Sequence, residues 1–244
     1  MILTDKQKLK IIKRDLVVND LSDEQLGEFC EYANAQYRAG SPVITDEDYD
    51  FIFLKALKAR LPNHKIFQSL EPEIIPFSEE KILIPQSMLS IDKAYSFNEI
   101  LKWIERILKS TSELNYDPNN LVLKATPKLD GFAGYDDGSK LYTRGDGKKG
   151  SDITRVFERG LKVFNNSERG QGPGEIVVKK SYFEQHLAIF FEFPRNFQAS
   201  LIKEKELDEH AKNAIKNDGA FFVPFQQLPN WIGSVEELNL ISKI

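Results

Sequence analysis

An irregular stretch divides this chain into two parts of different character. Residues 62–86 show no hydrophobic periodicity and carry four prolines, at Pro62, Pro72, Pro76 and Pro85. Proline has no backbone N–H and interrupts helices and central strands, so this stretch predicts a connector. The pattern before it is helical, and after residue 118 it becomes extended. We therefore expect an α+β protein, in which a small helical module (residues 1–70) precedes a domain built on antiparallel sheet (residues 71–244).

Three positions carry the signals that begin helices. A capping box, Ser22-Asp23-Glu24-Gln25, predicts a helix to about Arg38, and Thr45 caps a second helix that ends before Pro62. A second capping box at residues 96–99 begins a helix whose apolar residues form a stripe: Ile100, Ile104, Ile107 and Leu108.

The later part of the chain predicts strands joined by turns. Asp136-Asp137-Gly138-Ser139 is a strong hairpin signal between two predicted strands, Leu121–Tyr135 and Leu141–Arg144. Two further segments read as strands, Gly174–Lys180 and Gly219–Phe225. The charged stretch 203–218 predicts a solvated helix stopped by Gly219, and a last helix is expected from Ser234.

The composition excludes several classes of protein. The net charge of −4 argues against a free-standing DNA binder, which would show a basic footprint. No stretch is long and apolar enough to span a membrane, and the N-terminus lacks the hydrophobic region of a signal peptide. The single cysteine, Cys30, allows no internal disulfide. We expect a cytoplasmic protein without a membrane partner.

Lys128 is the first candidate for chemistry, in the segment Lys128-Leu129-Asp130-Gly131. In a strand, residues two apart point to the same face, so Lys128 and Asp130 would project together. A lysine amine that acts as a nucleophile must be deprotonated, and burial or charged neighbours control its pKa. The competing interpretation is a lysine at a strand edge, and the motif alone favours it.

Two further segments suggest contacts to phosphate and ribose. Thr143-Arg144-Gly145-Asp146-Gly147 combines glycines, which let backbone N–H groups approach an anion, with Arg144, whose charge suits phosphate. An ordinary glycine turn with a solvated arginine explains it equally well. Glu175 begins a predicted strand, where its carboxylate would accept a ribose hydroxyl, bind magnesium or simply be exposed.

An acidic and aromatic face is predicted at the start of the Thr45 helix. Asp46, Tyr49 and Asp50 lie at i, i+3 and i+4 and therefore share one face. The helix dipole accounts for an acid in the first turn, but not for the tyrosine and the second acid beside it. Such a face could hold a cationic heteroaromatic ring.

Taken in order, these segments resemble the N-terminal half of the NAD-dependent DNA ligases of bacterial type. The family patterns P-x-I-x-D-x-E-Y-D, P-M-L-S-L-D, K-L-D-G, T-R-G-D-G, G-E-V and N-P-R-N are matched in sequence by residues 42–50, 88–92, 128–131, 143–147, 174–176 and 193–196. The similarity spans roughly residues 20–225, and six motifs in the right order are a specific signal.

The resemblance implies a fold, an activity and a set of site residues. The fold would be an ATP-grasp-like nucleotidyltransferase domain, and Lys128, with Asp130 beside it, would attack the α-phosphate of NAD to form a lysyl-AMP used to seal nicked DNA in replication and repair. Magnesium would neutralise charge. The residues implied in binding NAD are Tyr37, Asp46, Tyr49, Asp50, Ser90, Ile91, Lys128, Arg144 and Glu175.

The chain also departs from the family pattern. Thr126 stands where the family has an acid, Pro173 and Ile202 where it has arginines, and Gln36 where it has an aromatic residue. The family's later lysine motifs are absent from these 244 residues. DNA would then be engaged through additional domains or a second ligase polypeptide.

Two other functions compete with this reading. A non-catalytic relative that binds a nucleotide or a partner protein is favoured by the substitutions at Thr126, Pro173 and Ile202. Another K-x-D-G nucleotidyltransferase, using ATP or GTP, is opposed by the Asp46–Asp50 helix, which among these enzymes is implied only for those that use NAD.

Overall fold

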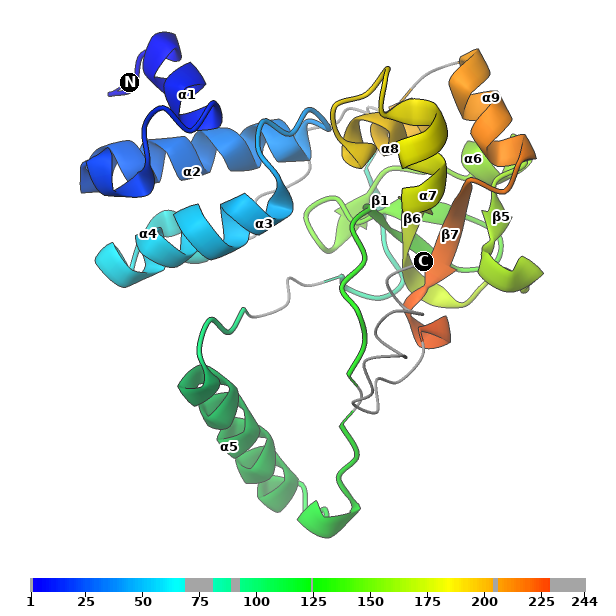
Figure 1. The fold of residues 1–244 in the computed structure, drawn as a ribbon. Helices are drawn as coiled ribbons and strands as arrows, with labels where there is room; N and C mark the ends of the chain where they lie inside the picture. Colours follow the sequence, from blue (N-terminus) through cyan, green and yellow to red (C-terminus); the bar gives the residue numbers. More distant parts are fainter. Residues whose placement is uncertain (1, 69–80, 89–92, 124, 204–205, 229–244) are drawn as a thin grey trace.

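The structure is a computed structural model that describes residues 2–68, 81–88, 93–123, 125–203 and 206–228. Its N-terminal part is helical, as predicted (Figure 1). Helices α1 and α2 are followed by a continuous helical segment with a π-helical middle, and the bounds are Asp5–Ile12 (α1), Asp23–Arg38 (α2), Asp46–Asp48 (α3), Tyr49–Leu54 (π-helical) and Lys55–Arg60 (α4).

Local hydrogen bonds begin these helices where the sequence predicts. The Ser22 hydroxyl accepts from the Gln25 N–H at 3.2 Å, and the Gln25 side chain accepts from the Ser22 N–H at 3.0 Å, which confirms the capping box. The Thr45 hydroxyl accepts from the Asp48 N–H at 3.1 Å. Buried side chains such as Phe29 give this helical module its own apolar core.

A five-stranded mixed sheet forms the centre of the second part in the described portion of the chain. The strand order is β3-β2-β6-β7-β5, with bounds Leu141–Thr143 (β3), Phe132–Asp136 (β2), Gly172–Val178 (β6), Ala220–Pro224 (β7) and Lys162–Val163 (β5). The hairpin at residues 136–139 and the strands near 174–180 and 219–225 are confirmed. The expected antiparallel pairing joins β3, β2, β6 and β7, and at one edge of the sheet β5 pairs with β7 in parallel.

The predicted strand Leu121–Tyr135 is wrong over most of its length. The strand begins only at Phe132, so Lys128 and Asp130 precede it. The alternation of side chains along a strand therefore does not place these two residues on one face. Pro127 has no N–H to donate to a neighbouring strand. Among the described residues, no strand pairs with the segment before Phe132.

Short strands and helices complete this part. The predicted connector contains a short strand, β1 (Ile82–Leu83). This strand pairs with β4 (Lys149–Gly150), which lies in the later part of the chain. The helices next to the sheet are Arg155–Glu158 (α6), Lys180–Tyr182 (α7, continuing as a π-helical turn to Leu187), Pro194–Lys203 (α8) and Glu209–Lys216 (α9). Apolar side chains between sheet and helices form the second core, including Phe132, Ile176, Phe197 and Phe222.

The single solvated helix predicted over 203–218 is wrong in three respects. Lys203 ends α8, and a separate helix, α9, begins after the Asp208 cap. One face of α9 is buried, because the sheet side of the helix packs into the core. The chain turns at Asp218, whose φ is +52°, and not at Gly219.

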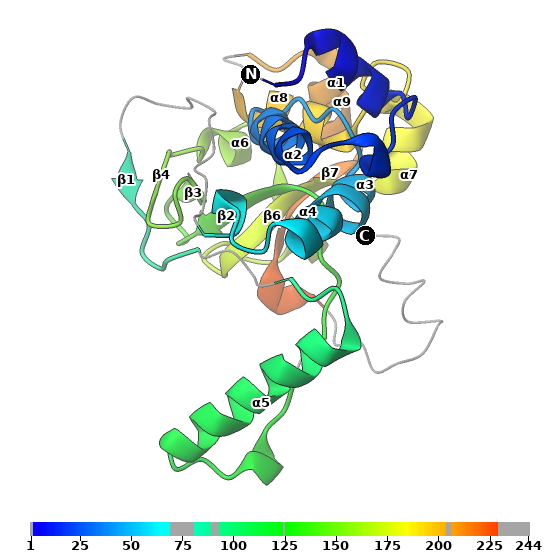
Figure 2. The same ribbon diagram turned by 90° about the vertical axis from the view of Figure 1, so that its left-hand side faces the viewer.

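Helix α5, Phe97–Glu113, begins at the predicted capping box and projects away from the sheet in both views (Figures 1 and 2). Ile100 and Leu108 of its apolar stripe are more than a third exposed. The helix predicted from Ser234 lies outside the described residues. Within the described part of the chain, no helix has both the length and the apolar character needed to cross a membrane.

Helix α8 joins the two parts at the C-terminal end of α2. The Arg195 Nε donates to the Tyr37 carbonyl at 3.1 Å, the Asn196 amide donates to the Gly40 carbonyl at 3.4 Å, and the Lys203 ammonium donates to the Ala39 carbonyl. The last carbonyls of a helix have no intrahelical donor and carry partial negative charge. This contact therefore positions the helical module against the sheet.

Candidate active site

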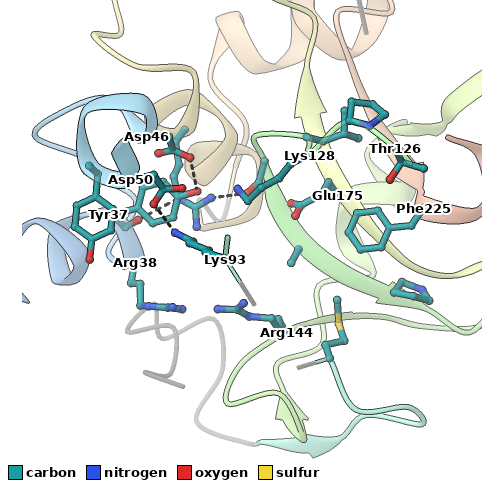
Figure 3. A pocket seen from close by; sticks show the side chains of 18 of the residues that line it. Tyr37, Arg38, Asp46, Asp50, Lys93, Thr126, Lys128, Arg144, Glu175 and Phe225 are labelled. Atoms are coloured by element: carbon teal, nitrogen blue, oxygen red, sulfur yellow. Dashed lines mark hydrogen bonds and ion pairs between the residues drawn. The ribbon is translucent and has the colours of Figure 1, made fainter. Parts of the chain in front are cut away.

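A cavity of about 610 Å³ contains most of the residues that the sequence singled out (Figure 3). They come from both parts of the chain, and those lining the cavity are Tyr37, Asp46, Tyr49, Asp50, Lys128, Arg144 and Glu175. Ser90 and Ile91 lie outside the described residues. Asp130 is not among the described residues that line the cavity.

The helical module contributes an acidic and aromatic wall. The Tyr37 hydroxyl donates to the Asp46 carboxylate at 3.3 Å, and the Tyr49 hydroxyl donates to the Cys30 carbonyl at 3.4 Å. Burial, followed by the Asp130 carboxylate, raises the pKa of Asp46 above its ordinary value of 3.8. Two hydrogen bonds hold the rings and the Asp46 carboxylate in place, and a cation beside Asp46 would favour its charged form.

Lys128 enters the cavity from the segment that precedes β2. Its ammonium acts on the pKa of Asp46 in the lowering direction, so the two side chains are electrostatically coupled across the cavity. Gly131, at the end of the K-L-D-G segment, lies so close to β6 that a Cβ would stand 2.3 Å from the Ile176 carbonyl oxygen. The glycine is therefore required by the close approach of two backbones.

Helix α8 holds the backbone of the same segment. The Gln198 amide donates to the Asp130 carbonyl at 3.0 Å, and the Arg195 guanidinium donates to the Gly131 carbonyl. Arg195 is 5% exposed and is stacked between two rings, with its Cζ 3.8 Å from the Tyr37 ring centroid and 4.2 Å from that of Phe132. It thus contacts the lysine segment and the helical module at once.

The Arg144 loop is a tight turn whose N–H groups are partly used within it. Gly147 N–H donates to the Arg144 carbonyl at 2.9 Å, and Asp146 N–H donates to the Lys149 carbonyl at 3.2 Å. Gly145 has φ +53°, a conformation that favours glycine. Two N–H groups of the loop are therefore engaged within the turn, and the anion cradle stays a prediction. The Arg144 side chain lines the cavity, with its Nε buried and lacking a hydrogen-bond partner among the described residues.

Glu175 lies at the centre of β6, paired with Ala133 of β2 and Val223 of β7. Its side chain lines the cavity, where Thr126 and Pro173 also lie. Two of the departures from the family pattern are therefore in the pocket itself. Ile202 is different, because it is fully buried in the core of the sheet part and is not among the described lining residues.

Sequence reasoning missed several lining residues, namely Arg38, Lys93, Arg195 and Phe225. Arg195 lies within the N-P-R-N-like segment, so a signal for it was present, whereas no pattern marked Lys93 or Phe225. Among the described residues, the charged side chains of the lining are mostly cationic: Arg38, Lys93, Lys128, Arg144 and Arg195 against Asp46, Asp50 and Glu175. A cavity with excess positive charge favours a ligand with phosphate groups.

The described residues contain no group of three or more histidine, cysteine, aspartate or glutamate side chains placed to hold a metal ion. Magnesium commonly keeps several waters and binds through one or two carboxylates together with the phosphates of a substrate. The donor set of this cavity therefore fits a magnesium ion carried by a phosphate ligand and does not form a cage of its own.

Comparison with known proteins shows which family this chain resembles. Residues 78–218 match the family described as the NAD-dependent DNA ligase adenylation domain. The chain is 62% identical to the DNA ligase of Vesicomyosocius okutanii over 229 residues, which are 94% of this chain and 36% of that protein. It is 48% identical to the DNA ligase of Shewanella baltica over 234 residues, 96% of this chain and 36% of that protein.

The chain thus spans 36% of the length of these curated relatives. The matched span covers 94–96% of this chain and therefore includes the helical module as well as the sheet. The chain therefore belongs to the NAD-dependent DNA ligases, and residues 78–218 are its adenylation domain.

Proposed function

We propose that Lys128 attacks the α-phosphate of NAD. The Lys128 amine forms a bond to phosphorus and releases a proton, and the bond from that phosphorus to the oxygen of nicotinamide mononucleotide breaks. Nicotinamide mononucleotide leaves with the bonding electrons, and AMP stays on Lys128 as a phosphoramidate. This is nucleophilic catalysis through a covalent intermediate.

The observation that carries this proposal is the meeting of Lys128 and Asp46 in one cavity. The two residues come from different parts of the chain, and a ligand that contacts both must extend between the helical module and the sheet. NAD is such a ligand, because it joins two nucleotides through a pyrophosphate. A nucleophile near the middle and a cation-binding wall at one end match that arrangement.

The helical module would hold the nicotinamide mononucleotide half. The ring of oxidised nicotinamide is cationic, so the Asp46 and Asp50 carboxylates attract it, and the Tyr49 ring offers a face for stacking. A cation–aromatic contact contributes about 0.5–2 kcal/mol, depending on desolvation. Tyr37 would support this wall through its hydrogen bond to Asp46.

The sheet would hold the adenylate half. Glu175, on the central strand β6, would accept a ribose hydroxyl, and Arg144 would pair with phosphate. Ser90 and Ile91 would complete the adenosine pocket. Asp130, which lies outside the described cavity lining, would influence the site through the charge of its carboxylate. Magnesium bound to the NAD phosphates would neutralise their negative charge. In this proposal residues 1–70 form the nicotinamide-binding module and residues 71–244 the adenylation domain.

Sealing of nicked DNA would be the use of this intermediate. Affinity for DNA requires the neutralisation of phosphates by basic side chains, and this chain has a net charge of −4. We therefore propose that DNA is engaged through additional domains or a second ligase polypeptide, as the resemblance implies.

Intact-mass analysis tests the proposal. After incubation with NAD and magnesium, the chain should gain the mass of AMP, and after incubation with ATP it should not. Lys128→Ala should abolish the gain, because no other nucleophile replaces the amine. Lys180→Ala, a change of the same type on α7 and outside the described cavity lining, is the matched control and should label like the parent.

The opposing results are equally clear. Labelling of Lys128→Ala at the parent's level would show that another residue is the nucleophile. A folded parent chain that binds NAD but never gains AMP would instead favour the non-catalytic relative, to which the Thr126 and Pro173 substitutions in the pocket point.

A further inference from the structure

Lys93 already contacts the wall that is expected to bind the nicotinamide ring. Its ammonium forms an ion pair with the Asp50 carboxylate (Figure 3). The same ammonium lies 5.9 Å from the centroid of the Tyr49 ring. These are an anion and an aromatic face, the two features that a cationic ring would use. The Lys93 ammonium therefore occupies the position that the cationic ring would take.

The ion pair is largely buried on the Asp50 side and partly exposed on the Lys93 side. The Asp50 side chain is 19% exposed and that of Lys93 is 37% exposed, and both line the cavity. Partly buried pairs are screened by salt less than surface pairs. The Tyr49 ring is oriented by its hydrogen bond to Cys30, so its face remains in place whether or not Lys93 is present.

We propose that Lys93 is a specificity-determining residue that competes with the cationic nicotinamide ring for Asp50 and Tyr49. The inference rests on the proposed role of these residues in NAD binding. When the ring binds, the Lys93 ammonium must leave Asp50, because two cations cannot share one carboxylate without mutual repulsion. Lys93 therefore lowers the affinity for NAD, whose ring is charged, and leaves that for NADH, whose ring is neutral, nearly unchanged.

The test compares NAD and NADH by equilibrium binding. Titration calorimetry is performed on the whole chain carrying Lys128→Ala, which prevents turnover. Adding Lys93→Met should lower the Kd for NAD about threefold to tenfold, in keeping with the cation–aromatic and charge contributions being displaced. The same variant should change the Kd for NADH by less than about twofold.

Two control variants separate this effect from general ones. Lys93→Arg keeps the positive charge and should leave the Kd for NAD close to that of the Lys128→Ala parent. Lys109→Met removes an equal charge from exposed α5, outside the described cavity lining, and should affect neither ligand. Circular dichroism of each variant checks the fold.

Three results would overturn the proposal. An unchanged Kd for NAD in Lys93→Met would show that the ammonium does not compete with the ring. Weaker binding of NAD and NADH alike would show that Lys93 contacts the ligand directly, for instance a phosphate. An equal gain for both ligands would show that the ring charge is not what Lys93 opposes.

Asp50→Asn, in the same Lys128→Ala chain, distinguishes failure of this inference from failure of the proposed site. If Asp50→Asn weakens NAD but Lys93→Met has no effect, the nicotinamide site stands and the competition by Lys93 is wrong. If neither variant changes the Kd for NAD, both the nicotinamide assignment and the inference are wrong.

Discussion

Asp46 connects the burial of a single residue with ligand binding. Burial and the neighbouring Asp130 raise the pKa of Asp46, so its folded-state pKa lies above the value of 3.8 expected for the unfolded chain. An acid with a raised pKa contributes stability that is fully present below the unfolded pKa and is lost as pH rises through the folded pKa. A cation bound beside Asp46 would favour its ionised form and lower its pKa again.

The pH dependence of NAD affinity should therefore have an acidic limb set by Asp46. As pH rises above 3.8 through the raised pKa of Asp46, the carboxylate ionises and the Kd for NAD should fall. Asp46→Asn should weaken NAD and flatten this limb, while raising the melting temperature of the ligand-free chain at neutral pH. Titration calorimetry and thermal unfolding across this pH range measure both effects. A limb that persists unchanged in Asp46→Asn would assign it to another group.

At the scale of elements, the β2–β3 hairpin is fixed by its own turn residues. Asp136 is 1% exposed and accepts from the Arg169 guanidinium at 2.7 Å and from the Gly138 and Gly170 N–H groups at 3.1 and 2.9 Å. These bonds tie the turn to the segment that leads into β6. The hairpin thus aligns the strands behind the cavity, where β6 carries Glu175.

Asp136→Ala should destabilise the chain by about 1.5–3 kcal/mol, because it removes the buried carboxylate that accepts from the Arg169 guanidinium and from two backbone N–H groups of the turn. Glu209→Ala, which breaks a fully exposed pair with Lys212, should leave the stability nearly unchanged. Chemical denaturation followed by circular dichroism gives both values. A loss below about 1 kcal/mol for Asp136→Ala would mean that the turn holds without this pair.

At the scale of the whole molecule, the site exists only because the two parts of the chain are docked. Helix α8 donates to the C-terminal carbonyls of α2, and Arg195 joins the helical module to the Gly131 carbonyl. Loss of this connection would shift the acidic and aromatic wall relative to Lys128. Misplacement of reacting groups by about 1 Å costs on the order of a hundredfold in rate.

Arg195→Met should slow self-adenylation from NAD by about tenfold to a hundredfold, while AMP binding in the sheet part changes little. The matched control is Arg155→Met, because Arg155 donates to the carbonyls of Ile202 and Lys203 at the end of α8 and is not among the described lining residues. Single-turnover rates measure the effect of each variant on adenylation, and AMP titrations measure its effect on AMP binding. If both variants slow adenylation equally at equal folded fraction, Arg195 acts only through stability.

The sequence by itself determined the features that depend on neighbouring residues. The helix starts at Ser22, Thr45 and Ser96 and the turn at residues 136–139 follow from hydrogen bonds between groups a few residues apart, and the structure confirms them. Most of the site residues that the sequence singled out likewise line the cavity, because each belongs to a short local pattern.

Only the tertiary structure decided the features that depend on distant segments. A strand needs a partner, so the segment before Phe132 could not be assigned from its own residues, and the break between α8 and α9 reflects how each helix packs into the core. The ion pair of Lys93 with Asp50 joins residues 43 positions apart, and Arg195 contacts Gly131 over 64 positions. No local pattern encodes such contacts, because they form only when separately folded elements dock and exclude water between them.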